Sequence, residues 1–385
     1  MDFKLNEQQQ MIQEMARKFA EDRIAPIAEK TDKEHRFPEE IIKEMGEIGL
    51  MGVAVPEEYG GAGMGYVEYV LAMIEISRVC ASTGVIMSVN NSLVCDPLMM
   101  FGTEEQKKKY LVPLAQGKKL GAFSLSEAGA GSDAGAVACR AKEDGDYFVL
   151  NGTKLWCTNG KEADIVILFA NTDPEQGSRG ISAFIIEKGT PGFNIGKLED
   201  KLGIRGTSTA EFVLEDCRVP KENMLGPRGK GYKVALATLD GGRIGIAAQA
   251  VGIGQASIDA AKKFAQERVQ FGKPISSFQA IQWMLADMAT ELESARLLTL
   301  KAASLKDAKE PFTLFSAMAK LKAAEVASFC ATKALQIHGG YGYTTDYPVE
   351  RYFRDARITE IYEGTSEVQR LVIASLVLKG LQGKG

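Results

Sequence analysis

The chain holds few of the side chains that most often build metal sites and nucleophiles. It has only two histidines, His35 and His338, and neither belongs to an HExxH or His-x-x-His spacing. Its six cysteines form no CxxC pair, so they suit neither a zinc site nor a disulfide framework. We therefore expect no metal site, and catalysis in this chain must rest on carboxylates, backbone dipoles or an organic cofactor.

One carboxylate stands where a side chain can reach into a cleft. Glu363 lies in the segment IYEGT, in which Gly364 and Thr365 mark the start of an apolar helix. A residue just before a helix lies on a loop, and loops carry many functional side chains. The same position also suits an acidic residue that the helix dipole favours. The local pattern alone leaves both interpretations open.

The 40 glycines of the chain raise the question of a nucleotide-binding loop. A Rossmann fingerprint requires GxGxxG between a strand and a helix. The nearest match, GAGSDAG at 129–135, has one residue too many, and β-type runs follow it where a helix should begin. The GxxxxGK[ST] pattern does not occur. Neither a nicotinamide-binding Rossmann domain nor a P-loop is predicted.

The elements that must position these residues follow the order α, β, α. Helical periodicity fills the first zone, where Thr103 and Gln106 form a capping-box pattern. Short β-type runs at roughly ten-residue spacing then predict a small antiparallel sheet. Four long segments with one apolar face predict a bundle of helices at 230–270, 277–308, 312–339 and 365–381. The expected domains are 1–118, 119–226 and 227–385.

Charge and hydropathy exclude several classes of function. The formal net charge is −4, and no basic field for nucleic acid or anionic lipid is present. No run of 18 or more residues is uniformly apolar, so no membrane span is expected. The N-terminus shows no basic segment followed by an apolar run. We expect a cytoplasmic protein with reduced thiols.

Seven segments together resemble the acyl-CoA dehydrogenase family, in that family's order and spacing. They are FSLSEAGAGSDAGA (123–136), NGTKLWCTNG (151–160), DKLGIRGTST (200–209), LDGGRIGIAAQAVG (239–252), ERVQFGKPISSFQAIQ (267–282), ALQIHGGYGY (334–343) and RDARITEIYEGTSEVQR (354–370). The similarity covers essentially the whole chain and is greatest to the short-chain, butyryl-CoA branch, through GVIMSVNNSL (84–93) and ITEIYEGTSE (358–367). It implies an α+β fold with an N-terminal helical domain, a central antiparallel β domain and a C-terminal four-helix bundle.

The resemblance also implies a reaction. Such enzymes use FAD to dehydrogenate an acyl-CoA thioester between its α and β carbons and pass the electrons to an electron-transfer flavoprotein. A carboxylate removes the α-proton while the β-hydrogen leaves as hydride to flavin N5, and the resemblance places that base at Glu363. Other branches hold the base immediately before the arginine of the segment 239–252. Here Gly242 precedes Arg243, so the assignment falls on Glu363.

The residues expected to hold FAD are carried over position by position. Those expected to line the isoalloxazine are Phe123, Leu125, Ser126, Trp156 and Thr158. Period-2 alternation places Trp156 and Thr158 on one face and Cys157, where the family more often has isoleucine, on the other. The ADP half is expected at a site shared between subunits, formed by Arg268, Gln279, Gln336, Gly339, Gly340, Thr365 and Glu367.

The substrate contacts implied by the resemblance are Ser132 at the pantetheine or its phosphate, the Gly364 backbone at the substrate, and Asp240 and Arg243 at the CoA adenine end. Because Asp240 and Arg243 lie three residues apart on a helix, they could equally form an intrahelical ion pair. The shared ADP site implies at least a dimer. The family is usually a tetramer, a dimer of dimers arranged through the C-terminal helices.

Several alternatives remain. Glutaryl-CoA dehydrogenases carry an arginine where Gly84 stands, which argues against a dicarboxylyl substrate. Dehydrogenases of cyclohexene-carboxyl-CoA use an aspartate on an early helix; Asn90 and Asn91 fill that region, although Asp96 lies nearby. A branched or cyclic acyl substrate, an oxidase that reduces oxygen, and a non-catalytic acyl-CoA-binding scaffold are the other possibilities.

Overall fold

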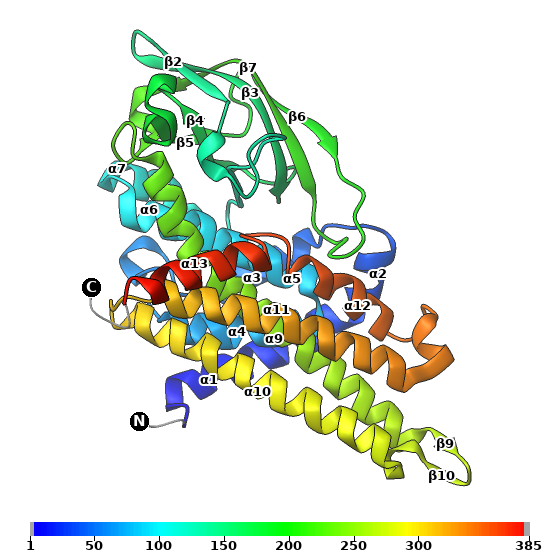
Figure 1. Cartoon of the computed structure of the whole chain (residues 1–385). Helices are drawn as coiled ribbons and strands as arrows, with labels where there is room; N and C mark the ends of the chain where they lie inside the picture. The colour runs from blue at the N-terminus through cyan, green and yellow to red at the C-terminus, as the bar shows by residue number, and fades with distance from the viewer. Residues whose placement is uncertain (1–3, 381–385) are drawn as a thin grey trace.

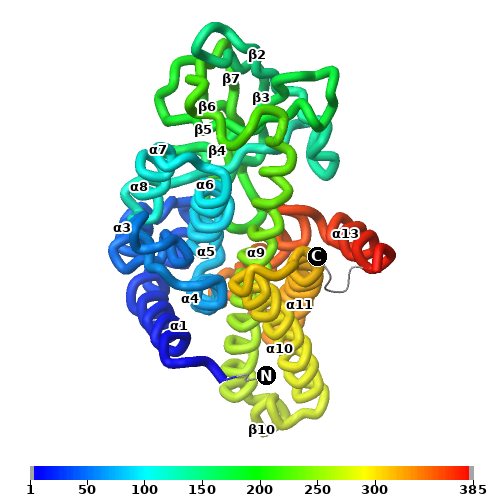
Figure 2. Tube along the Cα trace, turned by 90° about the vertical axis from the view of Figure 1, so that its left-hand side faces the viewer, coloured from blue at the N-terminus to red at the C-terminus, as the bar shows by residue number. Residues whose placement is uncertain are grey.

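Two helical segments of the chain pack into one elongated body, with a β domain seated at one end of it (Figure 1). The computed structural model describes residues 4–380. The expected start of the first domain at residue 1, the expected end of the last domain at 385 and the expected helix end at 381 lie outside these residues. In the view turned by 90°, the N-terminal and C-terminal helices lie side by side below the sheet (Figure 2).

The N-terminal domain consists of helices joined by short turns. They are α1 (Glu7–Phe19), η1 (Ala20–Ile24), α2 (Ala25–Lys33), α3 (Glu39–Glu47), η2 (Leu50–Gly52), η3 (Glu57–Tyr59), α4 (Tyr66–Val79), α5 (Ala81–Ser88), η4 (Val89–Cys95), α6 (Asp96–Phe101), α7 (Glu104–Gln106), η5 (Lys107–Leu111) and α8 (Val112–Ala115). The expected capping box is confirmed: Thr103 Oγ1 accepts from the Gln106 amide at 3.2 Å, and Gln106 Oε1 accepts from the Thr103 amide at 3.1 Å.

The continuous helical stretch Ala81–Phe101 is the one described segment long and apolar enough, by length and composition alone, to cross a membrane. Within the fold, 78% of its 18-residue apolar window is buried. It packs against α4 on one side and approaches β1 on the other. Its apolar character therefore matches the place it takes in the core, next to the site described below.

The β domain carries a mixed sheet. Its strands are β1 (Gly121–Ser124), β2 (Arg140–Asp144), β3 (Tyr147–Thr158), β4 (Ile165–Asn171), β5 (Ile181–Glu187), β6 (Phe193–Leu198), β7 (Thr209–Pro220) and β8 (Met224–Leu225). The order is β6-β7-β3-β2-β4-β5-β8, with β1 beside β4. Most pairs are antiparallel, as expected, but β1 runs parallel to β4 over four residues. β2 and β3 separate β1 from β4 in the chain, and no local pattern in the sequence indicates that β1 and β4 run parallel.

The C-terminal domain is built on three long helices. Its elements are α9 (Gly231–Glu267), the hairpin β9 (Val269–Gln270) and β10 (Lys273–Pro274), η9 (Ile275–Ser277), α10 (Gln279–Asp307), α11 (Thr313–His338), η10 (Gly339–Tyr343), α12 (Val349–Ile358) and α13 (Ser366–Leu378). α9 also packs on α4 of the N-terminal domain. A Cβ on Gly252 would lie 2.7 Å from the Ile74 carbonyl oxygen, so glycine permits the close approach of the two helices.

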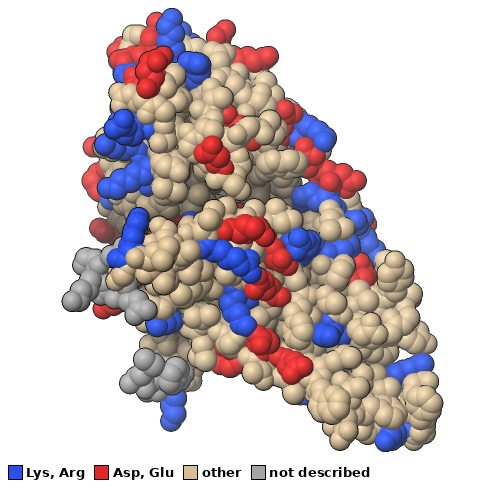
Figure 3. Space-filling model, in the orientation of Figure 1, with Lys and Arg blue, Asp and Glu red and all other residues tan. Residues whose placement is uncertain are grey.

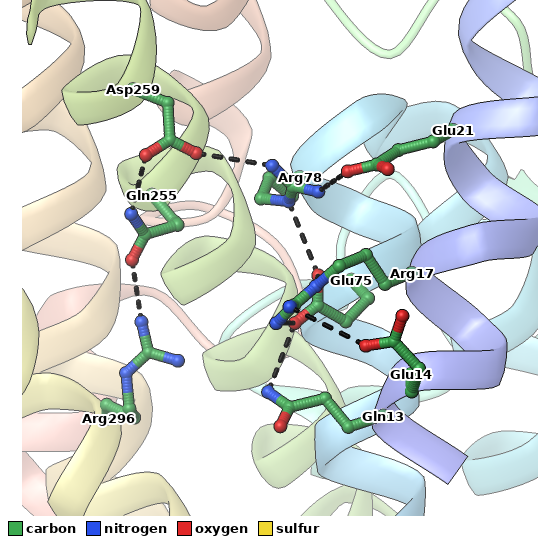
Figure 4. Close-up of polar contacts among 9 residues, drawn as sticks. All are labelled: Gln13, Glu14, Arg17, Glu21, Glu75, Arg78, Gln255, Asp259 and Arg296. Carbon is green, nitrogen blue, oxygen red and sulfur yellow. Dashed lines mark hydrogen bonds and ion pairs between the residues drawn. The ribbon is translucent and has the colours of Figure 1, made fainter. Parts of the chain in front are cut away.

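A chain of charged and amide groups fastens four helical elements together (Figure 4). The buried Glu75 of α4 accepts from Arg17 of α1 at 2.9 Å and lies 3.3 Å from Arg78. Arg78 reaches Asp259 of α9 at 3.3 Å, while Gln255 bonds both Asp259 and an arginine of α10. Two guanidinium groups thus offset the cost of burying one carboxylate, and they fix the N-terminal helices against the bundle.

Candidate active site

The loop between α12 and α13 has an unusual backbone. Glu363 has φ +51° and Gly364 has φ +90°; the first value is uncommon for any residue other than glycine. Three contacts hold this shape. Lys320 Nζ of α11 donates to the Gly364 carbonyl at 2.7 Å, Gln369 Nε2 donates to the same oxygen at 2.9 Å, and Thr365 caps α13 by accepting from the Val368 amide. The strained turn is therefore secured from two helices.

The loop directs the Glu363 carboxylate toward α9. The residue as a whole is partly exposed, but its Oε2 is buried and has no hydrogen-bond partner among residues 4–380. A Cβ on Gly242 would lie 2.3 Å from that oxygen and 2.8 Å from Leu93 Cδ2. Glycine at position 242 therefore leaves the space that the carboxylate uses.

The protonation of Glu363 is balanced near neutrality. Burial raises its pKa to about 7, and the positive charges of Lys320 and then Arg243 act against that rise. A carboxyl with a pKa in this range can be ionised at neutral pH and still accept a proton effectively. Because Glu363 Oε2 accepts no hydrogen bond from residues 4–380, it is free to accept a proton from a bound molecule.

Asp240 and Arg243 form the intrahelical ion pair that their spacing allowed. Arg243 Nη1 lies 2.5 Å from Asp240 Oδ1, and Thr313 donates to the other Asp240 oxygen at 2.7 Å. Burial raises the pKa of Asp240 and lowers that of Arg243. Arg243 Nε is buried without a partner in the described chain, so one donor of this pair stays available beside Glu363. Contact of the pair with CoA stays a prediction.

The residues expected to line the isoalloxazine gather where β1 and β3 end. Leu125 and Ser126 directly follow β1, and the Leu155 amide of β3 donates to the Ser126 carbonyl at 2.9 Å. Trp156 is 61% exposed. The hydroxyls of Ser126 and Thr158 make no hydrogen bond to the part of the chain that the structure describes. This strand edge offers an exposed aromatic ring and free hydroxyl groups.

The strand β3 bends at this edge. Trp156 has φ +63°, and the register with β7 shifts between Lys154 and Cys157. Period-2 alternation does not include this bulge, but the predicted direction of the Cys157 side chain is confirmed. The Cys157 thiol is fully buried and donates to Ser124 Oγ at 3.2 Å, so it points away from the face that Trp156 presents.

A buried ion pair beneath the same edge was missed by sequence reasoning. Lys154 is fully buried; its Nζ lies 2.7 Å from Glu127 Oε1 and donates to the Leu125 carbonyl at 3.0 Å. Glu127 also accepts from two backbone amides, those of Ala138 and Cys139. The pair joins β3 to the turn after β1. Both residues lie in segments that resemble the family, at 123–136 and 151–160. The sequence does not show that they are buried, because burial depends on the tertiary structure.

Two neighbouring residues of η4 connect the base loop to the sheet. Leu93 faces the space between Gly242 and Glu363, while Val94 is the residue that a Cβ on Gly121 of β1 would meet at 2.7 Å. η4 therefore contacts both α9 beside the carboxylate and the start of β1. Through η4, the helix that carries Gly242 and the strand that precedes Leu125 and Ser126 share one neighbour.

Most residues expected at the ADP half lie at the far end of the bundle, whereas Thr365 and Glu367 lie at the start of α13, close to Glu363 in the chain. Arg268 follows α9, with its guanidinium 5.3 Å from the Tyr341 ring centroid. Gly339 has φ +58°, and Gln336 and Gly340 are exposed in the same turn. From Gly242 to Arg268 the helix rises roughly 39 Å. Arg268 and the turn at Gly339 are thus far from Gly242 and Glu363 within one chain.

His338 has a packing role in this turn. Its ring stacks on Phe264 at 4.2 Å between centroids, and its Nδ1 lies 2.8 Å from the Ala334 carbonyl oxygen. Burial lowers the pKa of this imidazole. Three further predicted positions are exposed: Ser132 in the loop after β1, Gln279 at the start of α10 and Glu367 in the first turn of α13.

Positions that would indicate other substrates are occupied structurally. A Cβ on Gly84 would lie 2.1 Å from Ser77 Oγ, which leaves no room for an arginine. Asn90 and Asn91 bond the backbone of the preceding turns, for example Asn90 to Met51 O at 2.8 Å. Asp96 is paired with Lys306 at 2.5 Å. Neither the asparagines nor Asp96 offers a free base.

Models of the acyl-CoA dehydrogenase N-terminal, middle and C-terminal domains match residues 6–118, 122–217 and 229–378. The chain belongs to the acyl-CoA dehydrogenase family. The mitochondrial short-chain specific acyl-CoA dehydrogenase of Rattus norvegicus is 57% identical over 97% of this chain and 91% of its own length.

Solved structures agree with this membership. Butyryl-CoA dehydrogenase from Megasphaera elsdenii is 47% identical and superposes with a TM-score of 0.97, over 98% of this chain and all of that one. A chain in a structure described as the electron transferring flavoprotein of Acidaminococcus fermentans, in work on flavin-based electron bifurcation, is 54% identical with a TM-score of 0.98, again over 98% and 100%. The family fold, with an N-terminal helical domain, a middle β domain and a C-terminal helical domain, is therefore shown.

FAD is the cofactor of this family. The strand edge fits it, because a flavin ring needs hydrogen-bond donors at its polar rim and an aromatic cover. Ser126 and Thr158 have hydroxyls with no partner in residues 4–380, and Trp156 is exposed beside them. When bound, FAD supplies the acceptor for a hydride.

Proposed function

We propose that this chain dehydrogenates short, straight acyl-CoA thioesters to trans-2-enoyl-CoA, with Glu363 as the base that removes the α-proton. The observation that carries the proposal is the buried, unpartnered Glu363 Oε2 beside Gly242. Gly242 is the position at which other branches hold the base. The carboxylate from the loop therefore reaches the same space that a side chain on α9 would otherwise fill.

The local charges suit proton removal next to a thioester. An α-hydrogen is weakly acidic, so the site must favour developing negative charge on the thioester oxygen. Glu363 is a base with a pKa of about 7, and the positive charges of Lys320 and Arg243 act on it. Burial of the carboxylate keeps water from competing for the proton.

Support for a short acyl chain comes from the groups behind the base. The Tyr362 hydroxyl donates to Gln249 Oε1 of α9, and Gln249 Nε2 donates to the Ala81 carbonyl at 2.9 Å. Gln249 is fully buried. The group joins the base loop, α9 and α5, and we infer that the acyl chain extends toward it, so that the group stops a longer chain. The names of the short-chain and butyryl-CoA relatives point the same way.

A second copy of the chain is needed to complete the FAD site. An FAD whose ring lies at Ser126 and Thr158 cannot reach Arg268 of the same chain, roughly 39 Å from Gly242 along α9. The far end of the bundle is also apolar and exposed: Phe271 is 92%, Trp283 63% and Tyr343 88% exposed. Figure 3 shows few charged side chains at this end of the visible face. These features support a homotetramer built as a dimer of dimers.

Electron-transfer flavoprotein is the proposed electron acceptor. Support comes from the similar chain in the Acidaminococcus fermentans structure, whose description names that flavoprotein. Trp156 stands 61% exposed at the edge of the proposed ring site, which leaves a route from the ring to the surface. Over the face drawn in Figure 3, positive and negative side chains are interspersed, and no single-sign field favours nucleic acid.

Anaerobic titration of the FAD-loaded protein with butyryl-CoA tests the proposal. We expect a yellow protein that bleaches with butyryl-CoA and much less readily with a C16 substrate. The Glu363→Gln variant should keep FAD and lose bleaching. A colourless protein, or a Glu363→Gln variant that bleaches like the parent, would support the scaffold alternative instead. Hydrogen peroxide formation as fast as transfer to electron-transfer flavoprotein would indicate an oxidase.

A further inference from the structure

We propose that Lys320 of α11 is a positioning residue for the base. Its ammonium fixes the Glu363–Gly364 loop, and its positive charge keeps Glu363 ionised at neutral pH. The inference rests on the proposed role of Glu363 and adds a residue that no sequence segment had indicated.

The first observation is the burial of a cation that has no direct counter-ion. Lys320 is fully buried, and no carboxylate in residues 4–380 lies within 4.0 Å of its ammonium nitrogen. Its one hydrogen bond is to the Gly364 carbonyl at 2.7 Å. A buried ammonium that lacks a paired carboxylate destabilises a fold. Lysine at this position therefore calls for an explanation in the site it faces.

The second observation is that the hydrogen bond alone does not require a lysine. Gln369 Nε2 already donates to the Gly364 carbonyl at 2.9 Å and approaches the Glu363 carbonyl at 3.4 Å. A neutral amide is thus an adequate donor for this oxygen. What Lys320 adds beyond Gln369 is a positive charge placed under the turn.

The third observation concerns the other groups that face Glu363. Arg243 of α9 is engaged with Asp240 at 2.5 Å, so its charge is largely compensated. Tyr69 of α4 and Tyr362 beside the base are neutral, since burial raises the pKa of both phenols. Glu363 is the charge that acts most strongly on Lys320, ahead of Arg243, Glu360 and Glu367. Lys320 is therefore the cation that acts most strongly on Glu363 and that no carboxylate neutralises by direct pairing.

The burial of Lys320 and of Glu363 Oε2 makes their interaction strong. Opposite charges attract far more strongly at low effective dielectric than in water. Burial lowers the pKa of Lys320 to about 8, so the lysine is still charged at the pH at which Glu363 must ionise. Without the charge of Lys320, burial would raise the pKa of Glu363 further, because only Arg243, which is paired with Asp240, would act against the rise.

The test compares three substitutions by the pH dependence of flavin bleaching with butyryl-CoA, followed in a single anaerobic turnover. Lys320→Gln keeps a donor and removes the charge, Lys320→Met removes both, and Lys320→Arg keeps both. We expect the apparent pKa of the pH–rate profile to increase by about one pH unit in Lys320→Gln and Lys320→Met and to stay near the parent's value in Lys320→Arg. At pH 7 that shift means a loss of about five-fold, largely recovered at pH 9.

Two controls separate charge from structure. Lys322→Met, two residues further along α11 and paired with Glu291 instead, should leave the pH profile unchanged. Amide exchange of residues 361–366 should rise in Lys320→Met and stay close to the parent in Lys320→Gln. If Lys320→Met fails to fold, the comparison of Gln with Arg decides the question by itself.

The proposal is overturned if Lys320→Gln has the parent's pH profile, or if its rate falls equally at every pH. Either result would leave Lys320 only a packing and hydrogen-bonding role. Failure of the proposed function is recognised separately, because it would appear as normal bleaching in Glu363→Gln. In that case no pH effect of Lys320 could be attributed to the base.

Discussion

Gly242 and Glu363 occupy adjoining space: a Cβ on Gly242 would lie 2.3 Å from Glu363 Oε2. The relationship links a helix in the bundle to a loop that begins the last helix. It explains why a base supplied from the loop requires glycine at this point of α9, and it leads to the first prediction.

Gly242→Ala should displace the Glu363 carboxylate and slow flavin bleaching by butyryl-CoA at least ten-fold, because a contact of 2.3 Å forces the side chain to move. FAD content should be unchanged, since the strand edge is not touched. Leu236→Ala, at a 40% exposed position of the same helix, serves as the control. A Gly242→Ala enzyme with the parent's bleaching rate would show that the carboxylate does not act from this position.

The ionisation of Glu363 should be visible in stability as well as in rate. Its pKa is raised to about 7 in the folded chain, so the folded state holds the proton more tightly than the unfolded state. Stability is therefore lost as pH rises from about 4.5 to about 7, by about 3 kcal/mol at most. Glu363→Gln removes this loss. Its thermal midpoint should exceed the parent's at pH 8, and the difference should shrink toward pH 5. A difference that does not vary with pH would contradict a raised pKa.

The Lys154–Glu127 pair should be essential to the shape of the flavin edge. Lys154→Met leaves Glu127 buried without its cation, which costs about 3–5 kcal/mol. We expect a lower thermal midpoint and weaker FAD retention, measured by dialysis and absorbance. The double variant Lys154→Met/Glu127→Gln should recover part of the loss because no buried charge remains. Lys142→Met, on an exposed position of β2, should change neither quantity.

The thiols should be inert in the folded protein. All six cysteines are buried, and burial raises the pKa of Cys157 to about 12, so little thiolate is available to react. Native protein should not be labelled by a thiol reagent at pH 8, whereas denatured protein should react at every cysteine. Cys157→Ala should leave the flavin spectrum unchanged, since the side chain points away from the ring edge. A spectral shift would place Cys157 in contact with the flavin.

Local signals in the sequence predicted much of the architecture. The expected helices at 277–308 and 312–339 correspond to α10 (Gln279–Asp307) and α11 (Thr313–His338). Such helices follow from apolar periodicity and capping residues that lie within a few positions of each other. The parallel pairing of β1 with β4 was not predicted, because its direction depends on a connection rather than on the strands themselves.

The site shows the same division. Motif order identified the loop that carries Glu363 and the strand ends that carry Ser126 and Thr158. The burial of Lys320 and Lys154 was not predicted, because lysine side chains are mostly exposed and only the tertiary structure shows which of them are buried. The bulge at Trp156 was also missed, because its left-handed φ of +63° has no glycine to announce it.

The sequence by itself determined the α, β, α order, the capping of its helices and the family to which the residues around Glu363 point. Those properties depend on neighbours in the chain, so they can be read along it. Only the tertiary structure decided that Glu363 fills the space left by Gly242 and that Lys320 supports its loop. These relations depend on how α9, α11 and the last loop pack together, because low exposure and close charges arise only when distant segments meet.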